Sequence, residues 1–130
     1  MLNKIAAVLA FVIGAMAVFA GGKVLLGVPP DYYVIDWLPI YNFAIGVVSV
    51  FFSSVVIWKN SRLALPVAIA TIAAHAIVML ILLTAYRPVV APDSLVAMTV
   101  RLVVWSAILI LLLVQRGQEI TSQPVIGLSP

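Results

Sequence analysis

The 130-residue chain has no cysteine, and only 8% of its residues are charged. Without cysteine it cannot form disulfides, thiolate metal sites, iron–sulfur clusters or a cysteine nucleophile. So few charges exclude a water-soluble domain, in which roughly a quarter of the residues are charged. The hydrophobic content of 65% and the mean hydropathy of +1.29 instead indicate one compact domain in a membrane.

The sequence also lacks the residue sets that carry catalysis. No carboxylate lies inside a long apolar run, and no serine–histidine–aspartate set or glycine-rich phosphate loop can be recognised. We therefore expect a protein that is not an enzyme. Most lysines and arginines mark the ends of the apolar runs, which is typical of membrane topology and argues against nucleic acid as a partner.

Four apolar segments are long enough to cross about 30 Å of hydrocarbon, which takes about 20 helical residues. They cover residues 5–26, 40–58, 63–86 and 95–114. The first begins like a signal peptide, but its apolar run continues to about Leu26, so we expect an uncleaved transmembrane helix. We predict an all-α, integral-membrane four-helix bundle in residues 1–116, with left-handed, antiparallel up-down packing, and a polar tail at 117–130.

Two connections shape this bundle. The turn at 59–62 is so short that it predicts the second and third helices to be antiparallel neighbours. Between the first two helices, Pro29 and Pro30 end one helix and Pro39 suits the first turn of the next. The aromatic residues of this connection predict a short interfacial segment anchored at headgroup depth. These anchors are Tyr32, Tyr33, Trp37 and Tyr41.

The charged residues sort to the two ends of the bundle. One end collects Lys4, Lys59, Arg62 and Arg116 against Glu119. The other collects Lys23 and Arg87 against Asp31, Asp36 and Asp93. The positive-inside rule makes the first end cytoplasmic. We therefore predict a multi-pass protein of a bacterial-type inner membrane, with both termini and the tail in the cytoplasm.

Small and polar residues indicate the packed faces, because lipid-facing positions accept any apolar side chain. Each helix repeats them at alternating steps of three and four, which predicts left-handed packing with crossings near +20°. The four stripes are Ala7-Ala10-Gly14-Ala17-Gly21, Asn42-Gly46-Ser49-Ser53, Ala64-Ala68-Thr71-His75-Leu82 and Ser94-Met98-Arg101-Trp105. Equal depth in the bundle predicts that His75 faces Ser49, with Gly14 leaving room.

His75, the single histidine, lies at the centre of the third helix. An ionisable group at that depth is costly, which makes it a candidate site. It either bonds to Ser49 or Thr71 and fixes the helix register, or it relays protons, contacts a ligand, or ligates haem or a metal. A haem would need methionine or a partner subunit as its second ligand.

Arg101 lies about 9 Å inside the start of the fourth helix. It either reaches the outer headgroups or pairs with Asp36 or Asp93. Alternatively, Arg101 and Asn42 form an outward-open pocket for an anionic headgroup or a quinone carbonyl. Trp105, one turn deeper, would then stack on the guanidinium or on the ligand.

Three functions remain open from these patterns. The first is a non-catalytic structural or accessory subunit of a membrane assembly, without cofactor, whose partners are the lipid bilayer and other membrane subunits or further copies of itself. The second is a ligand-binding or proton-coupled transport protein with its pocket at Arg101 and Asn42, above His75. The third is an electron-transfer subunit that contacts quinone or haem.

Overall fold

The computed structural model describes residues 1–28 and 30–122 of the chain, which form helices and connecting turns without any strand. The elements are α1 (Leu2–Leu25), α2 (Leu38–Val48), the π-helix η1 (Ser49–Ser53), α3 (Ser54–Trp58), α4 (Ala64–Thr84) and α5 (Pro92–Ser122). Because α2, η1 and α3 run on as one helix, this part of the chain contains four helices long and apolar enough to cross a membrane. The predicted all-α four-helix bundle is confirmed.

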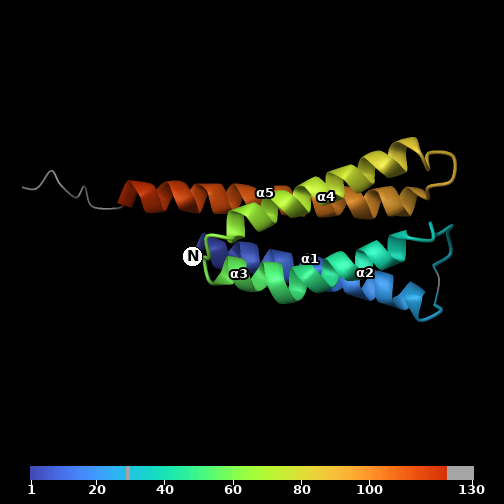
Figure 1. The fold of residues 1–130 in the computed structure, drawn as a ribbon, viewed down its shortest axis with the longest axis horizontal. Helices are drawn as coiled ribbons and strands as arrows, with labels where there is room; N and C mark the ends of the chain where they lie inside the picture. Colours follow the sequence, from blue (N-terminus) through green and yellow to red (C-terminus); the bar gives the residue numbers. More distant parts are fainter. Residues whose placement is uncertain (29, 123–130) are drawn as a thin grey trace, which may run out of the picture.

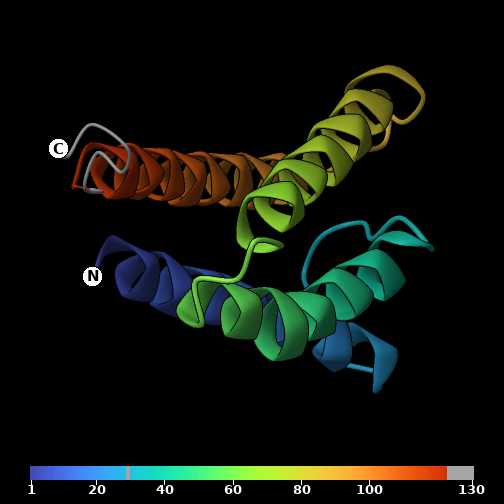
Figure 2. The same ribbon diagram turned by 60° about the vertical axis from the view of Figure 1, so that its left-hand side comes forward.

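The helices form two hairpins (Figure 1). One pairs α1 with α2, η1 and α3, and the other pairs α4 with α5. The hairpins join mainly where α1 packs on α5. The predicted antiparallel neighbours, the second and third long helices, contact each other closely only around η1, α3 and the start of α4. Away from the turn, α4 leans toward α5 (Figure 2).

The predicted stripes coincide with the buried faces. On α1 all five residues of the stripe are buried, and on α4 the same holds from Ala64 to Leu82. On the second and fourth long helices, Asn42 and Ser94 at the outer ends are half-buried and the other stripe residues are buried. The stripe prediction is confirmed because a 3.5-residue repeat keeps one side of a helix toward its neighbours.

Glycine allows α1 and α2 to approach closely. A Cβ added at Gly21 would lie 2.6 Å from the carbonyl oxygen of Pro39 and 2.7 Å from the nitrogen of Phe43. A Cβ at Gly46 would lie 2.7 Å from the carbonyl oxygen of Gly14. Because these contacts would be with backbone atoms, the helices can approach closely only where glycine, which has no side chain, occupies the position. Such small residues are common between membrane helices.

The last helix is longer than expected. It continues to Ser122, past the predicted end at 114 and through residues 117–122, which we had assigned to the tail. The physical reason is that polar composition ends a membrane span without ending a helix. Gln115 and Glu119, one turn apart, bond to each other, and Glu119 also accepts a bond from Asn60. Residues 123–130, the rest of the predicted tail, lie outside the described residues.

Two apolar clusters fill the bundle, one toward each end. The first contains Ala68 of α4 and Trp105 of α5, and the second contains Val78 and Met98 of the same two helices. Along α4 and α5, the buried polar residues His75 and Arg101 lie between the two clusters. The bundle therefore has a polar layer between two apolar layers.

Candidate functional site

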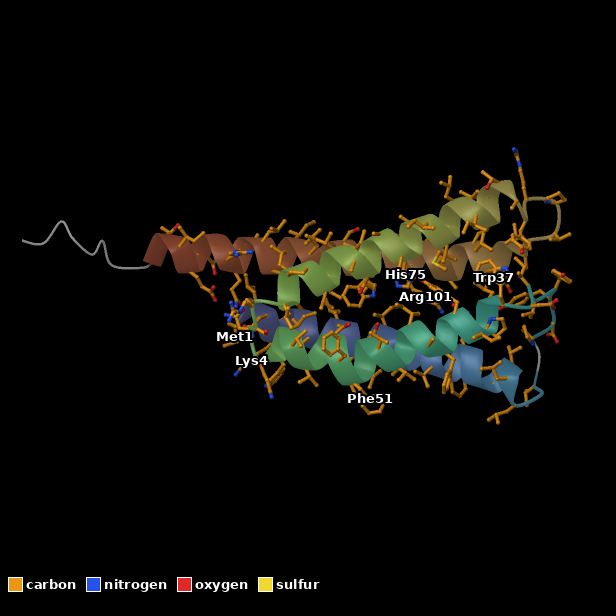
Figure 3. All side chains as sticks on the ribbon, in the orientation of Figure 1. Met1, Lys4, Trp37, Phe51, His75 and Arg101 are labelled. Carbon is orange, nitrogen blue, oxygen red and sulfur yellow. The ribbon has the colours of Figure 1, made fainter. Side chains whose placement is uncertain are left out.

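The polar layer consists of Tyr41 and Asn42 on α2, His75 on α4 and Arg101 on α5. The Tyr41 hydroxyl and the His75 Nδ1 share a hydrogen bond of 2.8 Å, and their rings pack edge to face. The Arg101 guanidinium donates to the Asn42 side-chain oxygen at 2.5 Å. Both bonds connect one hairpin with the other, and Figure 3 shows His75 and Arg101 close together inside the bundle.

The α2 side of the two bonds comes from two consecutive residues, Tyr41 and Asn42. They can bond to different helices because an α-helix turns about 100° per residue, so their side chains point in different directions. The Asn42 Cβ lies beside α1, since a Cβ added at Gly21 would be 3.2 Å from it. The Asn42 side chain reaches from there to α5. Tyr41 points instead toward α4, whose backbone is too distant for close packing with α2. A long aromatic side chain can bridge that separation.

His75 is 1% exposed, and its partner differs from the two that we predicted. Ser49 lies against α1, where a Cβ added at Gly14 would be 2.7 Å from the Ser49 Cβ. The Thr71 hydroxyl donates to the Val67 carbonyl within its own helix. The reason is that equal depth does not make two helices neighbours. The second long helix turns its small residues to α1, and Gly14 makes room for Ser49.

The expected anchors divide into two groups. Tyr32 and Tyr33 are exposed, and their role at the membrane interface stays a prediction. Tyr41, which we expected at headgroup depth, instead points inward to His75. Trp37 is half-buried and donates from Nε1 to the Tyr86 hydroxyl at 2.9 Å. It thereby ties the connection between α1 and α2 to the end of α4.

Arg101 is only 7% exposed. Its guanidinium has five N–H donors, and the bond to Asn42 uses one of them. Within residues 1–28 and 30–122, no carboxylate forms a salt bridge with it, so the expected pairing with Asp36 or Asp93 does not occur. Trp105 packs in the first apolar cluster and does not stack on the guanidinium.

Beside Asn42, where we predicted an outward-open pocket shared with Arg101, the structure has a small cavity. This cavity of about 40 Å³ lies between α1, the start of α2 and the connection joining them. Asn42, Tyr32 and Ser94 contribute its polar side chains, whereas Arg101 does not line it. It has room for a few water molecules, because one needs about 10–15 Å³ of such volume. Sites for drug-sized ligands measure about 300–1,000 Å³.

The chemistry open to the polar layer is limited. In the described part of the chain, no three His, Asp or Glu side chains come together as metal ligands would. One ring nitrogen of His75 is already occupied by Tyr41. What the arrangement does is join two helical hairpins through two side-chain hydrogen bonds in a region where their backbones do not pack closely.

A second polar cluster lies at the other end of the bundle, and our sequence reasoning missed it. The buried Asn3 amide donates to the carbonyls of Ile57 and Trp58, at 3.2 and 2.9 Å, and thus caps the end of α3. The Asn3 backbone nitrogen donates to the Gln115 side-chain oxygen on α5 at 2.6 Å. Extending the first stripe by one step back from Ala7 would have found Asn3, and extending the fourth by three steps beyond Trp105 would have found Gln115.

Comparisons with protein-family models, with curated proteins and with solved structures find no match for this chain. Its class follows from the helices themselves. The protein is a small multi-pass membrane protein in direct contact with the lipid bilayer, and residues 1–28 and 30–122 contain its four long apolar helices.

Proposed function

We propose that this protein is a non-catalytic structural or accessory subunit of a larger assembly in a bacterial-type inner membrane. The observation that carries the proposal is the closed polar layer. Its tyrosine, histidine, asparagine and arginine side chains bond to one another across the two hairpins. The cavity beside them, about 40 Å³, is well below the volume of sites that hold drug-sized ligands.

The surface supports the same interpretation. Four hollows of about 200–370 Å³ lie at the sides and at one end of the bundle, and no residue of the polar layer lines them. Large apolar side chains also stand far out from the helices. Phe51 on η1 is 73% exposed and points away from the bundle (Figure 3). Recognition by this protein therefore takes place on its outer faces, by packing against lipid or against other membrane helices.

The orientation that we propose places both termini in the cytoplasm. The end of the bundle that holds Lys4, Lys59, Arg62 and Arg116 carries a positive excess over Glu119. The opposite end carries more acidic than basic residues. Positive charge is retained on the cytoplasmic side during insertion.

Crosslinking in the native membrane tests the subunit proposal. A photoreactive phenylalanine analogue is placed at Phe51 on η1 and, separately, at Val103, an exposed residue on α5. We expect a crosslinked product of defined size from at least one of these faces and, after mild detergent extraction, a particle larger than the monomer. Recovery of the monomer alone, without a crosslink from either face, would contradict the proposal.

One observation favours ligand binding as a second candidate function. Arg101 is a buried cation without a carboxylate partner in the described residues, and such a residue is costly to keep in a membrane. The double variant Asn42→Leu/Arg101→Met separates the two functions, because it removes charge and partner together. A subunit with a purely structural polar layer still assembles with this change. A ligand-binding or proton-coupled protein folds but loses its response to ligand or pH.

A further inference from the structure

An apolar groove runs along one end of the lipid-facing surface of α1 and α3. It consists of two adjoining hollows of about 280 and 370 Å³. Val8 and Trp58 line both hollows, which makes the groove continuous. Its walls also include Ala7, Phe11 and Val55. We call this surface the α1–α3 groove.

Two lysines stand at the rim of the α1–α3 groove. Lys4 on α1 lines one hollow, and Lys59, directly after α3, lines the other. The Lys4 ammonium lies 5.1 Å from the centre of the Trp58 ring, in a cation–π contact. Neither lysine forms a salt bridge with a carboxylate in the described residues. An aromatic ring positions the Lys4 ammonium without neutralising it.

We propose that the α1–α3 groove binds one anionic phospholipid, with an acyl chain along Val8 and Val55 and the phosphate between Lys4 and Lys59. Acyl chains cover any apolar groove in a bilayer, so the groove alone selects no lipid. The two uncompensated lysines at its rim supply the selection, since they complement a net negative headgroup. A zwitterionic headgroup fills the same groove without that charge complement.

The opposite end of α1 offers a matched control. Lys23 lies 5.6 Å from the centre of the Phe19 ring, in the same kind of cation–π contact as Lys4. None of the hollows described above is lined by Lys23 or Phe19. Lys4 and Lys23 therefore have the same charge, are both exposed and both contact an aromatic ring. They differ because Lys4 lines the α1–α3 groove and Lys23 does not.

Quenching of tryptophan fluorescence by brominated lipids tests the proposal. The full chain is placed in phosphatidylcholine vesicles that contain a minor fraction of phosphatidylglycerol with brominated acyl chains, and then in vesicles with brominated phosphatidylcholine. Bromine quenches a ring that it touches, and Trp58 is the tryptophan of the groove. The Trp58→Phe variant gives the background from Trp37 and Trp105. We expect stronger quenching of Trp58 by the anionic lipid.

The variants decide between a site and general surface charge. Lys4→Gln is expected to lower the relative affinity for phosphatidylglycerol about fivefold, whereas Lys23→Gln leaves it unchanged. Equal loss in both variants, or equal quenching by the two brominated lipids, overturns the proposal.

A second pair of variants tests the groove itself. Val8→Phe fills the groove and is expected to abolish the preference. Met16→Phe, at an exposed site of the same helix outside the groove, keeps it. An unchanged preference in Val8→Phe also overturns the proposal. All four side chains are exposed, so helical circular dichroism is expected to show folded protein in each variant.

Discussion

Two adjacent glycines of α1 are expected to respond to alanine in opposite ways. A Cβ at Gly21 would lie 2.6 and 2.7 Å from backbone atoms of α2, which cannot swing aside as a side chain can. A Cβ at Gly22 would meet only the Phe43 ring, at 3.6 Å, an ordinary van der Waals distance. Gly21→Ala should therefore push α1 and α2 apart, and Gly22→Ala should not.

The magnitude follows from two opposing terms. Alanine favours a helix over glycine by about 1 kcal/mol, and this gain applies to both variants. Overpacking costs about 1–3 kcal/mol and applies to Gly21→Ala alone. We expect Gly22→Ala to raise the free energy of unfolding by up to about 1 kcal/mol. The difference between the two variants isolates the packing term and should be about 1–3 kcal/mol.

Reversible unfolding by sodium dodecyl sulfate in mixed micelles, followed by helical circular dichroism, measures this difference. Both variants and the parent protein are titrated under the same lipid and detergent conditions. Gly21→Ala should unfold at lower denaturant than Gly22→Ala. If the two variants changed stability equally, the backbone contact between α1 and α2 would not contribute to stability, and the reasoning would be refuted.

Three further predictions concern the buried polar residues, with the same unfolding assay. Tyr41→Phe removes the bond to His75 and should cost about 0.6–2 kcal/mol; no change would mean that the bond does not join the hairpins. Asn42→Leu leaves one N–H donor of the buried Arg101 without its acceptor and should cost about 1.5–3 kcal/mol, most of which a second change, Arg101→Met, should restore. A double variant as unstable as the single one would contradict this. Asn3→Leu leaves two carbonyls at the end of α3 without their donor and should lower the free energy of unfolding by about 1–3 kcal/mol. An unchanged free energy of unfolding would mean that water replaces the Asn3 amide and would contradict this prediction.

The helices and their buried faces could be predicted from the sequence because both depend on local chemistry. About 20 apolar residues are needed to span the hydrocarbon, and few other structures satisfy the backbone there. The stripes followed from helix geometry, which fixes the residues that share one side. Composition predicted the end of the last apolar span at 114 but not the end of its helix at Ser122, because the two are different physical events.

The contacts of the site could be predicted only in part. The stripes placed His75 and Arg101 on the packed faces of their helices, and both residues are buried. The sequence did not indicate their partners, because depth gives the position of a residue across the bilayer and does not say which helix lies beside it. Ser49 and His75 share a depth, yet one packs against α1 and the other bonds to α2 through Tyr41.

The glycines explain why Tyr41, and not Ser49, became the partner of His75. The stripe of small residues on the second long helix allows its backbone to approach α1 closely, and Gly46 and Ser49 pack there against Gly14. The other hairpin is reached by Tyr41, on the next face of α2, and by the amide of Asn42, at the outer end of the stripe, because both side chains are long enough to cross the wider separation. Small residues thus determine the tight interface, and long polar residues bridge the loose one. The polar layer is a consequence of this asymmetry between the two interfaces of α2.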